Sequence, residues 1–186
     1  MRLARLIATI ALLTVAAPAF AHPGHDHPGF AGGLLHPLTG ADHLLAMVAI
    51  GLFAGLRGGR AIWAWPLGFV AAAGMGFLAG RFGFVAPMVE PAVLASVFVL
   101  GLLVTMAARV NLGAGMALVA LFGFCHGQAH AGEAGSQAIV GFAAGFLITS
   151  AALHIAGLGL SRFTGKVWTR IAGAATMVGG LALAFA

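Results

Sequence analysis

The chain has 186 residues, of which 61% are hydrophobic and only 7% are charged. A soluble surface needs roughly a quarter of its residues charged, so this composition excludes a water-soluble globular protein and predicts an all-α integral membrane protein. The net charge of +5 does not indicate nucleic acid as a partner, because the basic residues are spread singly between apolar runs. The single cysteine excludes an intrachain disulfide and leaves polar chemistry to histidines and carboxylates.

The first 21 residues have the pattern of a cleavable signal peptide. Arg2 and Arg5 form the charged start, residues 6–16 the apolar stretch and residues 19–21 a small-x-small cleavage site. The alternative is an uncleaved first transmembrane helix, but the apolar stretch is shorter than the ~20 residues that span a bilayer. We therefore expect residues 1–21 to be removed.

Residues 22–33 then form a periplasmic, histidine-rich tail. His22, His25 and His27 lie close together directly after the cleavage site, and short histidine tracts often collect metal ions. The alternative is a tail that is merely solvated. The capture interpretation makes the tail an accessory metal site near the first membrane helix.

Residues 34–186 are predicted to form a bundle of six transmembrane helices. Each apolar run is near the ~20 residues that the hydrocarbon layer demands and is bounded by charge, glycine or proline. The runs are residues 34–56, 61–80, 91–108, 112–131, 137–160 and 167–186. The six runs leave no room for a soluble domain, and the chain has no phosphate-binding G-x-x-x-x-G-K sequence. An ATP-hydrolysing domain within the chain is therefore excluded.

Loop charges predict the orientation, because basic residues near helix ends stay in the cytoplasm. With the mature N-terminus outside, only Arg81 falls in an external turn. The cytoplasmic turns carry Arg57, Arg60, Arg109, Arg162, Lys166 and Arg170. We therefore expect a multi-pass protein of the bacterial inner membrane with both mature termini in the periplasm. Three tryptophans are expected at the cytoplasmic headgroup layer: Trp63, Trp65 and Trp168.

Glycines repeat at a spacing of four in several predicted helices. Small residues at this spacing let transmembrane helices approach closely, so we interpret these pairs as packing faces. The pairs are Gly51 and Gly55, Gly76 and Gly80, Gly123 and Gly127, and Gly141 and Gly145.

The first predicted membrane helix contains a polar cluster of His36, Asp42 and His43. An aspartate inside an apolar helix costs roughly 2.5–3.5 kcal/mol even on lenient insertion scales, which suggests a function. In a continuous helix His36 and His43 share a face, and Asp42 points about 100° away. Asp42 then either completes a ligand set or holds a histidine ring in place. The structural alternatives are helix capping by His36 and a simple pairing of Asp42 with His43.

A second cluster lies toward the end of the fourth predicted helix. His126, His130 and Glu133 share one helix face, and two imidazoles with a carboxylate suit a divalent transition metal. The predicted topology places this cluster on the periplasmic side, level with the start of the first helix. The two clusters together predict one metal site of His36, Asp42, His43, His126, His130 and Glu133.

These motifs resemble the HupE/UreJ family of bacterial nickel permeases, which act as hydrogenase or urease accessory proteins. The H-x5-D-H pattern of His36, Asp42 and His43, and the motif that ends at Glu133, carry the resemblance. The family pattern F-H-G-x-A-H-G-x-E differs here at Cys125 and Ala131. The resemblance covers essentially the whole mature chain. It implies a six-helix permease that carries nickel toward hydrogenase or urease maturation and holds no permanent cofactor.

Two polar residues outside the clusters keep two interpretations each. His154, in the fifth predicted helix, is either an exit ligand or a structural histidine hydrogen-bonded to Ser150. Cys125 is either a soft ligand or a small buried thiol between helices.

The sequence favours a secondary permease over an enzyme. A permease needs ligands in the outer half of a bundle, a polar route inward and moderate affinity. The ligand set indicates a divalent transition metal as cargo, and the resemblance implies nickel, with cobalt as the alternative. The alternatives are a bis-histidine haem redox protein, an intramembrane metallohydrolase with Glu133 as base, and a metal-binding accessory protein that does not transport.

Overall fold

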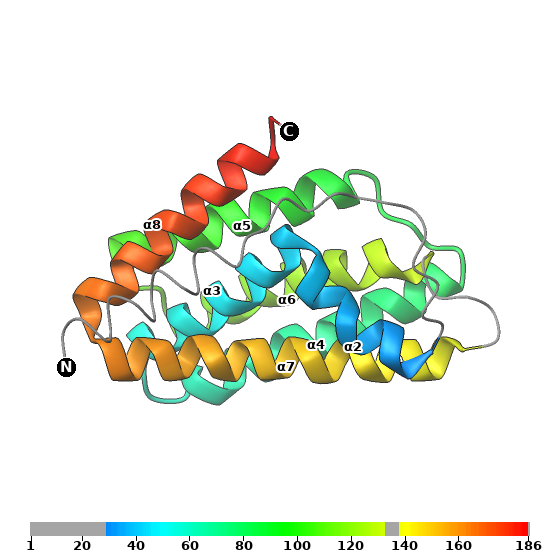
Figure 1. The fold of residues 1–186 in the computed structure, drawn as a ribbon, viewed down its shortest axis with the longest axis horizontal. Coiled ribbons are helices and arrows are strands. Elements are labelled where there is room, and N and C mark those ends of the chain that lie inside the picture. The colour runs from blue at the N-terminus through cyan, green and yellow to red at the C-terminus, as the bar shows by residue number, and fades with distance from the viewer. Residues whose placement is uncertain (1–28, 133–137, 186) are drawn as a thin grey trace.

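The computed structural model describes residues 29–132 and 138–185, which form seven α-helices and no strand. The predicted signal peptide, the tail histidines His22, His25 and His27, and Glu133 lie outside the described residues. The helices are α2 (Phe30–Thr39), α3 (Ala41–Arg57), α4 (Ala61–Arg81), α5 (Val89–Met106), α6 (Leu112–Ala131), α7 (Ile139–Thr164) and α8 (Lys166–Leu183). Figure 1 shows them as one elongated bundle.

The first predicted membrane helix is broken, which corrects the expectation of one continuous helix over residues 34–56. Gly40 has extended backbone between α2 and α3, and the two helices meet at 83°. α2 begins at Phe30, earlier than expected, and Pro37 lies within it. A membrane interior tolerates such a break where neighbouring helices satisfy the freed backbone groups. Here Gly40 still donates to the His36 carbonyl and accepts from the Leu44 N–H, and Thr149 of α7 ties α2 to α7 by a hydrogen bond to the Leu34 carbonyl at 2.9 Å.

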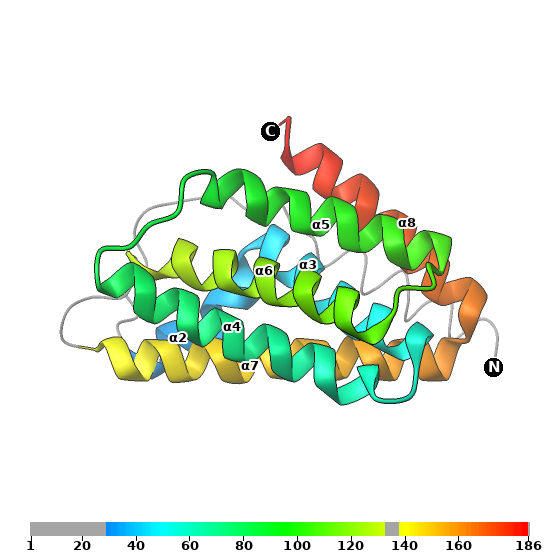
Figure 2. The ribbon, with the colours of Figure 1, turned by 180° about the vertical axis from the view of Figure 1, so that it is seen from behind.

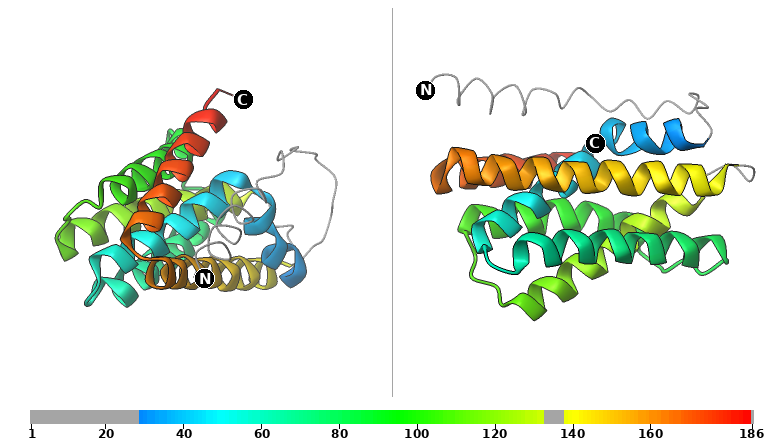
Figure 3. Two further views of the ribbon diagram at one scale, coloured as in Figure 1. Left: turned by 60° about the vertical axis from the view of Figure 1, so that its left-hand side comes forward. Right: turned by 90° about the horizontal axis from the view of Figure 1, so that it is seen from below.

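The two halves of the broken helix follow α7 one after the other. In the right-hand view of Figure 3, α2 lies along the first half of α7. Gly145 of α7 packs on the α2 backbone, and further along Gly51 and Gly55 of α3 pack against His154 and Ser161 of α7. The α2–α3 pair and α7 therefore run parallel to each other.

The remaining helices pack in pairs around α3. α4 lies beside α6, as Figure 2 shows from behind, and α5 lies beside α8. α3 contacts α2, α4, α5, α7 and α8, and its middle, from Ala49 to Ala54, is buried. The central helix of the bundle is thus the one that begins with the Asp42–His43 pair.

The glycine pairs lie at close helix contacts, as predicted. Gly76 and Gly127 bring the backbones of α4 and α6 together, because a Cβ at either position would overlap a carbonyl group of the facing helix. The same holds for Gly51 and Gly145 on other helix pairs. These glycines set how closely the helices around the polar residues approach.

Four helices are long and apolar enough to cross a membrane, namely α4, α5, α6 and α7, and the bent α2–α3 pair makes a fifth span if it is counted as one. α8 has 18 residues but is not apolar enough to count among them. The described residues therefore support a multi-pass helical membrane protein.

One predicted interfacial tryptophan is in the core instead. Trp65 is fully buried, stacks on Phe53 with ring centroids 4.5 Å apart, and donates its indole N–H to the Leu112 carbonyl at 3.1 Å. Trp63 is exposed, with the Arg60 guanidinium 5.8 Å from its ring. The headgroup interpretation is therefore wrong for Trp65, whose polar atom is satisfied inside the bundle.

Candidate metal centre

Four histidines from three helices form a continuous row of rings inside the bundle. His36 comes from the end of α2, His43 from the first turn of α3, and His126 and His130 from successive turns of α6. The ring centroids are 4.3 Å apart for His36 and His130, 4.2 Å for His130 and His43, and 4.6 Å for His43 and His126. The two motifs therefore meet, although they lie more than 80 residues apart in sequence.

Asp42 holds the His43 ring in one orientation. Its Oδ1 atom accepts hydrogen bonds from His43 Nδ1 and from the His43 backbone N–H, each at 2.8 Å. A proton on Nδ1 leaves Nε2 of a neutral ring with a lone pair, which can accept a hydrogen bond or bind a metal. His43 Nε2 is hydrogen-bonded to His130 Nε2 at 2.5 Å. A carboxylate behind a ligating imidazole is the arrangement that orients histidines in metal sites.

Ser96 of α5 orients His126 in a similar way. The Ser96 hydroxyl donates to the Val93 carbonyl at 2.6 Å, so its oxygen accepts from His126 Nε2 at 2.9 Å. In a neutral ring, Nδ1 then carries the lone pair. The His126 side chain is fully buried, and its Nδ1 has no hydrogen-bond partner in the described residues. A buried acceptor without a partner is costly and suits a ligand.

Phenylalanines close the row from the sides. On α7, the Phe142 ring lies 5.7 Å from the His36 ring, and the Phe146 ring lies 4.8 Å from the His130 ring. Phe69 of α4 lies 5.5 Å from the His126 ring. This apolar lining helps to bury the His126 and His130 rings, whereas His36 at the outer end of the row stays half-buried.

The cluster is not preformed for an ion. Within residues 29–132 and 138–185, no three His, Cys, Asp or Glu side chains have the geometry to hold one metal. Two imidazole nitrogens bound to one ion at 2.0–2.1 Å stand about 3 Å apart, wider than the present contact between His43 and His130. An ion would therefore have to separate these two rings, which suits transient binding better than a rigid structural site.

The structure brings together five of the six residues predicted as a metal site: His36, Asp42, His43, His126 and His130. The expectation that His36 and His43 share one helix face is wrong, because Gly40 separates their helices. Their rings lie 6.1 Å apart across the break instead.

Two supporting polar residues were not expected from the sequence. Ser96 orients His126, and its only signal was a hydroxyl within an apolar run. Gln128, inside the second motif, accepts from the Ala86 backbone N–H at 3.1 Å and donates to the Phe84 carbonyl at 2.6 Å. Gln128 therefore fastens the α4–α5 segment to the end of α6.

The structure also shows the surroundings of Cys125 and His154, for which the sequence left two interpretations each. Cys125 is buried on α6, as expected for a packed thiol. His154 makes no hydrogen bond to Ser150 in the described residues, and the Ser150 hydroxyl donates to the Phe146 carbonyl at 2.8 Å. Neither ring nitrogen of His154 has a partner within the described residues.

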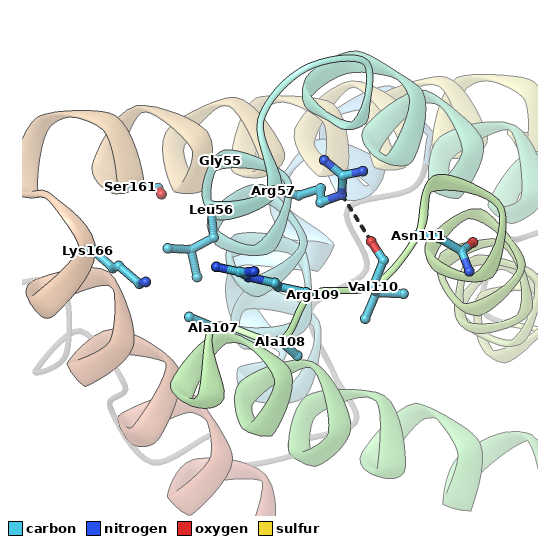
Figure 4. A pocket seen from close by; sticks show the side chains of 10 residues that line it. All are labelled: Gly55, Leu56, Arg57, Ala107, Ala108, Arg109, Val110, Asn111, Ser161 and Lys166. Atoms are coloured by element: carbon cyan, nitrogen blue, oxygen red, sulfur yellow. Dashed lines mark hydrogen bonds between the residues drawn. The ribbon is translucent and has the colours of Figure 1, made fainter.

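A cavity of about 700 Å³ opens at the end of the bundle away from the histidines. Arg57, Arg109 and Lys166 line it, together with Ser161 and the α5–α6 turn (Figure 4). Arg57 Nε donates to the Val110 carbonyl at 3.0 Å. Three turns predicted to be cytoplasmic therefore meet at one end of the molecule.

Together, these features define a multi-pass helical membrane protein with a row of histidines that is half-buried at His36 and buried from His130 to His126. A family model described as HupE / UreJ protein matches residues 10–183. Protein HupE of Rhizobium leguminosarum bv. viciae is similar to the chain, with 37% identity over 188 residues that cover 98% of each sequence. No solved structure matches. The chain therefore belongs to the HupE/UreJ family, a family of nickel or cobalt transporters that are accessory to hydrogenase or urease.

Proposed function

We propose that the protein is a secondary permease that carries Ni²⁺, or Co²⁺, from the periplasm to the cytoplasm for hydrogenase or urease maturation. The observation that carries this proposal is the row of His36, His130, His43 and His126, of which the last three are buried and His36 is half-buried. Nitrogen ligands suit late divalent transition metals. Ionisable groups inside a membrane bundle are costly and mark ion pathways.

The proposed topology has six spans, with both mature termini in the periplasm and a signal peptide cleaved after Ala21. The α2–α3 pair follows α7 in the same direction, as expected if both run from the outside to the inside. α8 completes the set as a sixth span that packs on α5. The basic residues around the cavity support a cytoplasmic location for that end. The histidine row then lies toward the periplasm of the inner membrane.

The route of the ion follows from this orientation. Nickel gathers at His22, His25 and His27. It then binds to the histidine row, where Glu133 is a further ligand, and moves inward by ligand exchange. Loose coordination supports conduction, because an ion that is bound too tightly cannot leave.

A metal-binding accessory protein without transport is the principal alternative. A haem protein fits less well, because the His43 and His126 rings contact each other directly, whereas a porphyrin plane must lie between two axial ligands. The closely spaced row that leads away from the outer end favours transport over storage.

The test is uptake of radiolabelled nickel by cells that lack other nickel permeases, with cobalt and zinc as competitors. We expect uptake with the wild-type chain, and none above background with His43→Ala or His130→Ala at equal amounts of protein in the membrane. The absence of wild-type uptake would refute the proposal. Nickel that binds to the purified protein without uptake would favour the accessory role.

A further inference from the structure

His154 is a fully buried histidine that the histidine row does not include. It lies in the middle of α7, its side chain is fully buried, and neither ring nitrogen has a hydrogen-bond partner in the part of the chain that the structure describes. A buried imidazole without partners destabilises a fold unless something binds it. Within a membrane bundle, such a group indicates a function.

The position of His154 continues the row inward. Its ring meets Phe69 edge to face, with centroids 5.1 Å apart, and the same Phe69 ring lies 5.5 Å from His126. Along α7, His154 comes eight residues after Phe146, which contacts the His130 ring. At 1.5 Å per residue this is about 12 Å deeper along the helix.

The same face of α7 leads on to the basic cavity. Ser161 follows His154 by seven residues, close to two full turns and about 10 Å, and it lines the cavity. Gly51 and Gly55 of α3 pack against these two positions. His154 therefore lies between the histidine row and the inner end of the molecule.

We infer that His154 is a second, inner coordination point for the transported divalent cation, next to the Phe69 ring that also contacts His126 of the row. This inference rests on the proposed permease function. Two sites of moderate affinity let an ion enter at one and leave from the other.

A purely structural role for His154 makes different predictions. Because neither nitrogen is hydrogen-bonded, His154→Leu removes a buried polar group without leaving a partner unsatisfied. The variant should therefore melt at the same temperature as the wild type or higher. A residue that serves only packing would then leave transport unchanged. His154→Gln is the second variant, because it keeps a polar side chain but loses the imidazole.

The experiment uses the purified full-length chain, with equilibrium binding of Ni²⁺ in detergent and Ni²⁺ flux into proteoliposomes. We expect both His154 variants to keep nickel affinity at the outer row within about twofold, and to lose roughly tenfold or more of the saturating flux. Ser150→Ala, one turn away on the same helix, should transport like the wild type. His43→Ala should lose outer-site binding and flux.

The outcomes separate the inference from the function on which it rests. Wild-type flux in His154→Leu or His154→Gln, with His43→Ala inactive, would overturn the inner site and leave the permease intact. No nickel flux by the wild type would overturn both. Equal loss of flux in Ser150→Ala would show that this face of α7 acts through packing, and would also overturn the inner site.

Discussion

Replacement of Asp42 tests whether its carboxylate orients His43 or binds the ion itself. The carboxylate holds Nδ1 of the ring at 2.8 Å, so Asp42→Ala frees the ring to rotate and to change tautomer. Loss of such a supporting group typically lowers metal affinity 10–100-fold, or about 1.4–2.8 kcal/mol at about 1.4 kcal/mol per factor of ten. Asp42→Asn keeps an oxygen acceptor but loses the charge, so its loss of nickel affinity should lie near the lower end of this range.

The assay is equilibrium binding of Ni²⁺ to purified protein, with nickel uptake measured in parallel. Wild-type affinity in both variants would refute the orienting role. A complete loss of binding in Asp42→Asn, equal to that of His43→Ala, would show that Asp42 is itself a ligand. The graded order of wild type, Asn and Ala is the result that the geometry requires.

Three further predictions concern packing, protonation and capture. Gly127→Ala places a methyl group on the Ala73 carbonyl and should cost about 1–3 kcal/mol, seen as less protein in the membrane and a lower melting temperature. Gly113→Ala meets only an ordinary contact and is the matched control. The apparent affinity for nickel should fall as the medium is made acidic, because imidazole binds metal only when neutral; a KM that stays constant down to the pH at which the protein unfolds would argue against histidine ligands. Replacement of His22, His25 and His27 by alanine should lower uptake at limiting nickel but not at saturating nickel, and loss of the saturating rate would make the tail part of the conduction site.

Apolar length predicted most helices well, because a membrane span must be long and apolar wherever it packs. The expected bounds of residues 112–131 coincide with α6. The break at Gly40 was missed, since a count of apolar residues does not register a bend. Gly40 keeps its own backbone bonds to neighbours in sequence, donating to the His36 carbonyl and accepting from the Leu44 N–H. The contact that ties α2 to α7, from Thr149 to Leu34, cannot be read from local sequence.

The site was predictable to the extent that polar residues are expensive in hydrocarbon. That cost singled out Asp42 and the histidines before any contact was known. The supporting residues were not predictable in this way. Ser96 can orient His126 only because α5 packs beside α6. The Trp65 indole N–H is satisfied in the core only because it donates to the Leu112 carbonyl. Both depend on helix neighbours rather than on local pattern.

The break at Gly40 also shapes the electric field inside the bundle. A helix ends in partial negative charge at its carbonyl end and in partial positive charge at its amide end. α2 brings its carbonyl end to the histidines, whereas the positive end of α3 is offset by Asp42 in its first turn. Interrupted helices in transporters use such carbonyl ends to receive cations. The bend therefore places a negative pole inside the membrane, where a continuous helix would have none.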